Sequence, residues 1–279
     1  MNYLKDYREG EKFVGTYLCK QKQILKTKAG KTYYSLTLQD KTGTADGKIW
    51  ELNNGIANFE PMDYIHCEGM VTSFQGNLQM NISRVRISDE GEYDPADYVP
   101  CTNKDVGEMF SRILKYVASV QNKYLRKILE MYFVENKEFV DAFKKHSAAK
   151  SVHHGFMGGL LEHTLSVTDM CQYFAEHYPM IHRDLLITAA LFHDMGKIQE
   201  ISDFPMNDYT DDGQLLGHIY IGARCMENAA AQIPNFPPKL KNELVHCILA
   251  HHGKMEFGSP KVPAIMEAMA LHMADNADA

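Results

Sequence analysis

The stretch Leu191-Phe192-His193-Asp194-Met195-Gly196-Lys197 places an imidazole and a carboxylate side by side at the end of an apolar run. Residues 184–192 read Asp-Leu-Leu-Ile-Thr-Ala-Ala-Leu-Phe, which is apolar on all sides and predicts a buried helix. An unpaired carboxylate in such surroundings is costly, so Asp194 needs a partner or a metal ion. Alone, the pair is equally consistent with a chance His-Asp neighbour at a helix end that Gly196 terminates.

The second half of the chain repeats this feature, with imidazoles and carboxylates on apolar helix faces or at helix ends. Each one alone has an ordinary explanation, such as a hydrogen-bonded core histidine, a cap, or a charge that interacts with a helix dipole. Burying all of them without a shared purpose would be expensive, and a common cation removes that cost. The predicted metal ligands are His163, His193, Asp194, His218, His251, His252 and Asp275.

The chemistry of this donor set narrows the kind of site. Imidazole mixed with carboxylate suits Mn, Fe, Co, Ni or Zn better than Ca or Mg. The absence of cysteine ligands disfavours a structural zinc. The donors suffice for two neighbouring ions, and two metals about 3.5–4 Å apart form a clamp for in-line displacement at phosphorus. We therefore expect two divalent transition-metal ions, manganese first among them.

Composition bounds the class of protein. A chain of 279 residues suits two domains, and 45% hydrophobic with 23% charged residues is ordinary for a globular protein. The net charge of −7 argues against a protein that coats duplex DNA. The six cysteines are scattered, which fits reduced thiols in a cytoplasm. The polar first residues are not a signal peptide, and no apolar run approaches the ~20 residues of a membrane span.

The first part of the chain alternates with period two and predicts a β-barrel. Turn residues such as Gly30-Lys31 and Gln75-Gly76 separate the alternating runs. Five strands, with a short helix at 51–59 between the third and the fourth, follow the order of an OB barrel. The predicted strands are 12–22, 33–39, 44–50, 63–72 and 77–87.

Alternation also assigns the faces of these strands. Leu36 and Leu38 are expected in the core, and Tyr33 on the opposite face. If Lys48 and Trp50 also point outward, the three residues form an aromatic and basic surface suited to stacking the bases of a single strand. The alternative is that Trp50 is part of the core. A cluster of lysines at 20–31 adds positive charge to this half.

The remainder reads as a linker and a helical bundle. Residues 89–102 are acidic and contain two prolines, Pro95 and Pro100, so they predict a linker. The expected fold is α+β and multidomain: a five-stranded OB-like β-barrel at 1–88, followed by an all-α bundle at 103–279 with a metal core at about 150–276. The predicted helices are 104–120, 122–134, 136–146, 159–177, 184–195, 214–232, 238–252 and 263–276.

The order of these ligands resembles a known superfamily. His163, then His193-Asp194, then Asp275 is similar to the HD phosphohydrolases, and the added histidines resemble their two-metal branch. The resemblance implies catalytic roles for Asp194 and Lys197, because Lys197 matches the lysine of the His-Asp-x-Gly-Lys motif that holds a substrate phosphate. It also implies two ligand sets. One ion takes His163, His193, Asp194 and Asp275, and the other takes His218, His251 and His252 with Asp194 shared.

An OB-like barrel followed by such a domain, with the stretch 151–167, is similar to the YhaM family of bacterial 3′→5′ exoribonucleases. That resemblance implies a cytoplasmic, metal-dependent 3′→5′ exonuclease that acts on single-stranded RNA, with DNA as an additional substrate. His153 and His154 are expected to touch the substrate phosphate or to shape their loop. Arg224 is a further phosphate candidate.

Two other functions fit the same residues. One is an HD phosphohydrolase of a small nucleotide or signalling phosphoester, although the absent Gly-Tyr-Pro element disfavours cyclic dinucleotides. The other is a non-catalytic nucleic-acid-binding accessory factor whose HD core is structural. No membrane partner is expected for this protein, and its sequence leaves a homo-oligomer around a strand end open.

Overall fold

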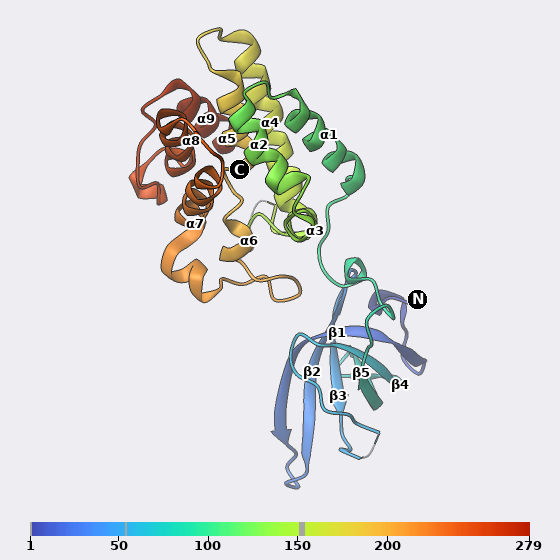
Figure 1. Ribbon diagram of the computed structural model, residues 1–279. Coiled ribbons are helices and arrows are strands. Elements are labelled where there is room, and N and C mark those ends of the chain that lie inside the picture. The colour runs from blue at the N-terminus through green and yellow to red at the C-terminus, as the bar shows by residue number, and fades with distance from the viewer. Residues whose placement is uncertain (1, 54, 151–153) are drawn as a thin grey trace. The chain divides into compact units, whose positions relative to one another are not determined.

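The computed structural model describes residues 2–53, 55–150 and 154–279. The chain divides into two compact units, Met1–Pro100 and Cys101–Ala279 (Figure 1). The first is built of strands and the second of helices. Among the described helices, none combines the length and the hydropathy that a membrane span requires.

The first unit is a closed barrel with the strand order β1-β2-β3-β5-β4, which confirms the predicted OB-like fold. The first half of β1 pairs with β4 and its second half with β2, with a bulge between Cys19 and Gln21. One long, bent strand therefore joins both sides of the sheet. The strands are β1 (Lys12–Lys26), β2 (Thr32–Asp40), β3 (Gly43–Ile49), β4 (Tyr64–Phe74) and β5 (Asn77–Ile87), preceded by a 3₁₀ turn, η1 (Leu4–Asp6).

The barrel core follows from the alternation of the strands. Leu36 and Leu38 are buried on the inner face as predicted, and Ile49 is fully buried beside them. The β4–β5 hairpin turns at Gln75 and Gly76, which both have positive φ. Such turns match the right-handed twist of the paired strands, and they favour glycine at the second position.

The helix expected at 51–59 is wrong: the described residues of this stretch form no helix. The segment instead runs beside β5, where the N–H of Ala57 donates to the carbonyl of Val85. This places Phe59 in the barrel core with 1% of its surface exposed. Glycine and several asparagines make the stretch a poor helix former, so burying one phenylalanine decides its path.

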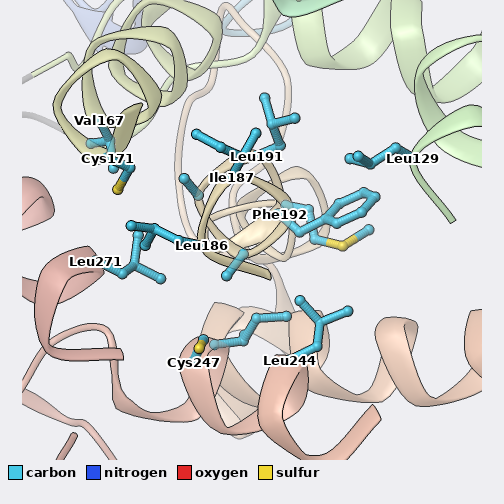
Figure 2. Packing of buried hydrophobic residues seen from close by; sticks show 14 of the residues in the cluster. Leu129, Val167, Cys171, Leu186, Ile187, Leu191, Phe192, Leu244, Cys247 and Leu271 are labelled. Atoms are coloured by element: carbon cyan, nitrogen blue, oxygen red, sulfur yellow. The ribbon is translucent and has the colours of Figure 1, made fainter. Parts of the chain in front are cut away.

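The second unit is a bundle of helices around a buried central one, α5, as its sequence predicts. Leu186, Ile187 and Leu191 of α5 belong to one buried hydrophobic cluster with side chains of α2, α4, α8 and α9 (Figure 2). The elements are η2 (Pro95–Asp97) in the first unit, then α1 (Val106–Ser119), α2 (Lys123–Phe133), α3 (Lys137–Lys145), α4 (Gly159–His177), α5 (Arg183–Phe192), α6 (Lys197–Glu200), α7 (Asp211–Ala231), α8 (Pro238–Ala250), η3 (Met255–Phe257) and α9 (Met266–Asp278).

Two details of the second unit differ from the prediction. The helix predicted at 214–232 is not continuous: α7 breaks at Gly217, where φ is 72° and ψ is 154°, and Leu215 before the break is 80% exposed. Gly196 does not terminate a helix. Its backbone is right-handed helical, and a Cβ there would lie 2.1 Å from the carbonyl oxygen of His218. Gly196 therefore permits the close approach of the α5–α6 turn to α7.

Candidate metal centre

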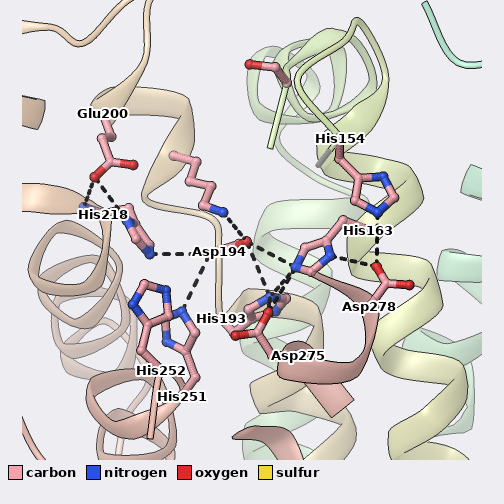
Figure 3. Close-up of polar contacts among 12 residues, drawn as sticks. His154, His163, His193, Asp194, Glu200, His218, His251, His252, Asp275 and Asp278 are labelled. Carbon is pink, nitrogen blue, oxygen red and sulfur yellow. Dashed lines mark hydrogen bonds and ion pairs between the residues drawn. The ribbon is translucent and has the colours of Figure 1, made fainter. Parts of the chain in front are cut away.

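Side chains from α4, α7 and α9, together with the residues that follow α5 and α8, converge on one buried place (Figure 3). Asp194 lies at its middle, 2% exposed. Its Oδ2 is 3.3 Å from Nε2 of His163 and 3.4 Å from Nε2 of His193. Its Oδ1 is 3.5 Å from Nε2 of His218 and 3.6 Å from Nε2 of His251. Each carboxylate oxygen therefore faces its own pair of imidazoles.

Asp275 and His252 complete the two groups. Oδ1 of Asp275 lies 3.2 Å from Nε2 of His163 and 3.7 Å from Nε2 of His193. On the other side, nitrogens of His218, His251 and His252 all lie within 4.8 Å of one another. The structure thus brings together every residue that the sequence analysis assigned to the metals, in the two expected groups.

The orientation of the five imidazoles is set by their Nδ1 atoms. Every Nδ1 has a carbonyl or carboxylate oxygen as its partner, and such oxygens only accept hydrogen bonds, so Nδ1 carries the proton. In its neutral form each ring then directs the lone pair of Nε2 inward, as metal-bound histidines do. The partners are Asp278 for His163 (2.8 Å), Ala190 for His193 (2.8 Å), Glu200 for His218 (3.0 Å), Ile248 for His251 (2.7 Å) and Phe257 for His252 (2.8 Å).

These lone pairs provide a test of whether a cation fits. The Nε2 atoms of His163 and His193 are only 3.1 Å apart, and two neutral acceptors repel at that distance unless a positive charge lies between them. The buried Nε2 atoms of His218 and His251 and Oδ1 of Asp194 have no hydrogen-bond partner among the described residues. Donors about 2.1 Å from one ion are roughly 3 Å apart at right angles. The residues therefore fit metal ions.

Electrostatics lead to the same conclusion. Burial raises the pKa of Asp194, but the positive charge of Lys197 outweighs it and holds that pKa well below its usual range. Burial likewise opposes ionisation of Asp275, yet the contact with His163 lowers its pKa to about 2. Burial lowers the pKa of His251, so this ring is neutral at neutral pH and its lone pair is available. Ionised carboxylates and neutral imidazoles are the forms that bind metals.

His163 differs from the other rings. Its burial lowers the pKa, but the surrounding carboxylates, first that of Asp194, raise it well above the ordinary value. Either a proton on Nε2 of His163 or a metal ion would place a positive charge between the facing imidazoles of His163 and His193. Metal binding at this group is therefore expected to displace a proton.

Sequence reasoning missed two residues that orient the ligands, Glu200 and Asp278. Oε1 of Glu200 accepts both the backbone N–H (2.9 Å) and the Nδ1–H of His218 (3.0 Å), which is the first residue after the break in α7. Asp278 accepts from Nδ1 of His163 and from the hydroxyl of Ser166. Glu200 follows Lys197 by one helical turn, and Asp278 follows Asp275 by three residues. This closeness in sequence to predicted site residues was the only sign of their role.

Lys197 reaches the same carboxylate. Its Nζ lies 2.7 Å from Oδ2 of Asp194. Burial lowers the pKa of Lys197, but the negative charge of Asp194 opposes burial, and the net effect is a raised pKa. The ammonium also lines a cavity of about 300 Å³ at the edge of the centre. A substrate phosphate in that cavity would lie within reach of Lys197. The cavity is lined by Ala148, Ala149, His154, His163, Lys197, His252, Phe257, His272, Asp275, Asn276 and Ala279.

The remaining phosphate candidates have different positions. His154 lines the cavity, and its Nε2 lies 3.1 Å from Oδ2 of Asp278. Arg224 is not among the lining residues, and its guanidinium lies 5.7 Å from the ring centre of Tyr220. His153 lies outside the described residues.

The expected base-stacking residues lie on the outer face of the barrel. Trp50 is 39% exposed, so it is not a core residue, and its ring stacks on Tyr33 with centroids 4.6 Å apart. Trp50 Nε1 donates to Oδ1 of Asn81. Lys48 has the same orientation but is less available, because its Nζ contacts Asp46 at 2.5 Å and Ser35 at 2.8 Å. Trp50 is therefore the exposed residue of this surface, and the half-buried Tyr33 is stacked against it.

Comparison with known proteins connects this geometry to a family. Residues 160–279 match the HD domain family. Over 252 residues the chain is 32% identical to the 3'-5' exoribonuclease YhaM of Geobacillus sp. (strain WCH70), covering 90% of this chain and 76% of that protein. The Bacillus subtilis (strain 168) protein of the same name is 32% identical over 257 residues, covering 90% and 79%. The chain belongs to the YhaM family of 3'-5' exoribonucleases.

The YhaM relatives match across both units of the chain. The protein of Listeria innocua is 32% identical over 285 residues, covering 99% of this chain and 88% of its own length. The expected resemblance to the YhaM family is therefore confirmed. Among solved structures, the second OB-fold domain of replication protein A from Methanococcus maripaludis is 20% identical, with a TM-score of 0.27, covering 33% of this chain and 98% of that chain. The barrel is identified by its own strand order.

Proposed function

We propose that this protein is a metal-dependent 3′→5′ exonuclease that hydrolyses phosphodiester bonds of single-stranded RNA. Membership of the YhaM family supports the direction and the substrate class. The observation that carries the chemistry is the pair of imidazole nitrogens of His163 and His193, 3.1 Å apart with their lone pairs facing each other beside Asp194. A positive charge must separate these nitrogens, either a proton on His163 or a metal ion, and a buried site of this composition suits transition metals.

Two ions are proposed, with manganese first among Mn, Fe, Co, Ni and Zn. His163, His193, Asp194 and Asp275 would hold one, and His218, His251 and His252 the other, with Asp194 between them. When bound, such ions would lower the pKa of water and stabilise the negative charge that develops on the oxygens around phosphorus. Lys197 binds and orients a phosphate oxygen in the cavity. Its ammonium group is largely shielded from water, which strengthens its attraction to that oxygen. The Nδ1 partners keep each ligand ring in one tautomer.

The barrel is proposed to capture the strand. The stacked rings of Tyr33 and Trp50 offer a platform for bases, and stacking is worth about 1–3 kcal/mol per base. We assign nucleic-acid binding to residues 1–88, a connecting role to 89–102, and hydrolysis to 103–279. The same proposal places the protein in the cytoplasm and leaves room for a homo-oligomer.

The experiment that tests this function uses RNA labelled at either end. With Mn²⁺, wild-type protein should release labelled mononucleotide from 3′-labelled single-stranded RNA from the first time points, while 5′-labelled RNA shortens progressively. Asp194→Ala should lose bound metal, because both ion groups share this carboxylate. Its rate of nucleotide release should fall by at least a hundredfold. Full activity of Asp194→Ala would exclude the metal mechanism. Hydrolysis of small phosphoesters without trimming of RNA would favour the small-substrate alternative.

A further inference from the structure

One histidine in the cavity has no role in the proposed chemistry. His272 lies on α9, three residues before Asp275, and lines the same cavity as Lys197 and His252. It is partly buried and belongs to neither group of candidate ligands. The ring of His272 therefore lies beside Lys197, in the cavity where a substrate would bind.

The ring of His272 is held in one orientation. Its Nδ1 lies 2.9 Å from the carbonyl oxygen of His251, and since a carbonyl only accepts, Nδ1 donates. One ring face covers Gly253. A Cβ at Gly253 would lie 2.2, 2.3 and 2.5 Å from Cε1, Nε2 and Cδ2, and these similar distances place it over the face of the ring rather than in line with Nε2. Gly253 has a φ of +77°, so the position suits glycine for this reason as well.

This arrangement leaves Nε2 as the ring atom that is free to contact a ligand. Among the described residues, none makes a hydrogen bond to it. With the proton fixed on Nδ1, Nε2 of the neutral ring is an acceptor. Phosphate oxygens are also acceptors and are served by Lys197 instead. The hydrogen-bond donor closest to a phosphate in a nucleic acid is a hydroxyl group of the sugar.

We propose that His272 accepts a hydrogen bond from a hydroxyl group of the 3′-terminal ribose and so makes the site prefer ribonucleotide over deoxyribonucleotide ends. The inference rests on the proposed exonuclease function and adds the specificity of that same cavity. His272 is a substrate-binding residue in this scheme. Its Nδ1 anchors the ring and its Nε2 reads the sugar.

The test compares wild type with His272→Asn. The asparagine amide nitrogen takes the place of Nδ1 and retains the bond to the carbonyl of His251, but nothing replaces the acceptor at Nε2. The substrates are single-stranded oligonucleotides of one sequence that end in ribose, 2′-deoxyribose or 3′-deoxyribose. Wild type should remove the ribose end about 5- to 10-fold faster than the deoxy end that lacks the bound hydroxyl, the effect of one neutral hydrogen bond. In His272→Asn this ratio should fall towards one.

Matched measurements separate the possible outcomes. Met273→Ala, at an exposed neighbouring residue that does not line the cavity, should retain the wild-type ratio. Metal content should be equal in wild type and His272→Asn. The deoxy end that wild type removes more slowly than the ribose end identifies the bound hydroxyl group, because that end lacks it. An unchanged ratio in His272→Asn, or an equal loss of rate on all ends, would overturn the inference. A wild-type protein that cleaves no end at all would instead refute the exonuclease function.

Binding gives a readout that does not depend on turnover. Oligonucleotides with a phosphorothioate at the terminal linkage resist cleavage and can be titrated against the metal-loaded protein. Wild type should bind the ribose end more tightly than the deoxy end, and His272→Asn should bind both alike. Equal affinities in wild type would contradict a hydroxyl contact.

Discussion

Glu200 shows how one buried carboxylate can determine a ligand's position. It orients His218 through two hydrogen bonds, to the backbone and to the ring. Residues that orient a metal ligand typically change metal affinity by 10–100-fold when they are replaced. In Glu200→Ala, which removes the acceptor of both bonds, we expect such a loss at the group of His218, His251 and His252, with the other group retained. Metal analysis after dialysis should then fall from two ions per chain towards one.

The control for this prediction is Gln199→Ala, at the exposed neighbour of Glu200 on the same short helix. It should retain both ions. A loss of both ions in Glu200→Ala would mean that the two groups do not bind metal separately.

Trp50 allows a second prediction at the scale of single residues. Replacing it with alanine removes a stacking surface but no core contact, because the side chain is exposed. Trp50→Ala should weaken binding of a short single-stranded RNA about 5- to 150-fold, the equivalent of about 1–3 kcal/mol. The thermal midpoint should change little. Fluorescence anisotropy with a labelled oligonucleotide measures the first quantity, and unchanged affinity would exclude this face as a binding surface.

The residues that could be predicted from sequence are those with unusual chemistry in an apolar setting. His163 and Asp194 stand out because ionisable groups on buried faces need a reason. Glu200 and His272 did not stand out, because their importance depends on which backbone atoms lie opposite them. Only the fold brings the carbonyl of His251 to His272, or the N–H of His218 to Glu200.

At the scale of elements, the break in α7 is the feature that sequence periodicity missed. Gly217 has a φ of 72° and a ψ of 154°, a region that only glycine occupies at low cost. Gly217→Ala should destabilise the helical unit by about 1–3 kcal/mol through the backbone, since a Cβ there meets nothing closer than 3.8 Å. The thermal midpoint should fall by roughly 2–12 °C.

Gly222→Ala is the matched control within the same helix. Its Cβ would make only ordinary contacts, the nearest at 3.6 Å, and alanine is the better helix former. This variant should be as stable as wild type or slightly more stable. Equal effects of the two substitutions on stability would show that the backbone conformation at Gly217 does not require glycine.

Strand and helix periodicity predicted most other elements, because a buried face imposes period two or 3.6 on the sequence. The stretch 51–59 failed since its path is set by the long-range burial of Phe59 and the pairing with Val85. Helix α6 was missed because a helix of four residues has no period to detect.

At the scale of the whole molecule, metal binding should stabilise only the unit that contains the ligands. All candidate ligands belong to Cys101–Ala279. A ligand that binds the folded state stabilises it in proportion to the logarithm of its concentration over Kd, about 2.7 kcal/mol at a hundredfold excess. Chelation should therefore lower the thermal midpoint of the helical signal by several degrees and leave the β-barrel signal unchanged. In Asp194→Ala the chelator should have no effect.

The two halves of β1 have a consequence for how the barrel assembles. Its second half meets β2 a short distance along the chain, whereas its first half meets β4, as in the pairing of Lys12 with Met70. The latter contact closes a long loop, which costs chain entropy before any burial rewards it. A nascent chain released before β4 is made would carry β1 with an open edge, the kind of edge on which other chains can pair. Completing β4 covers that edge and removes the hazard.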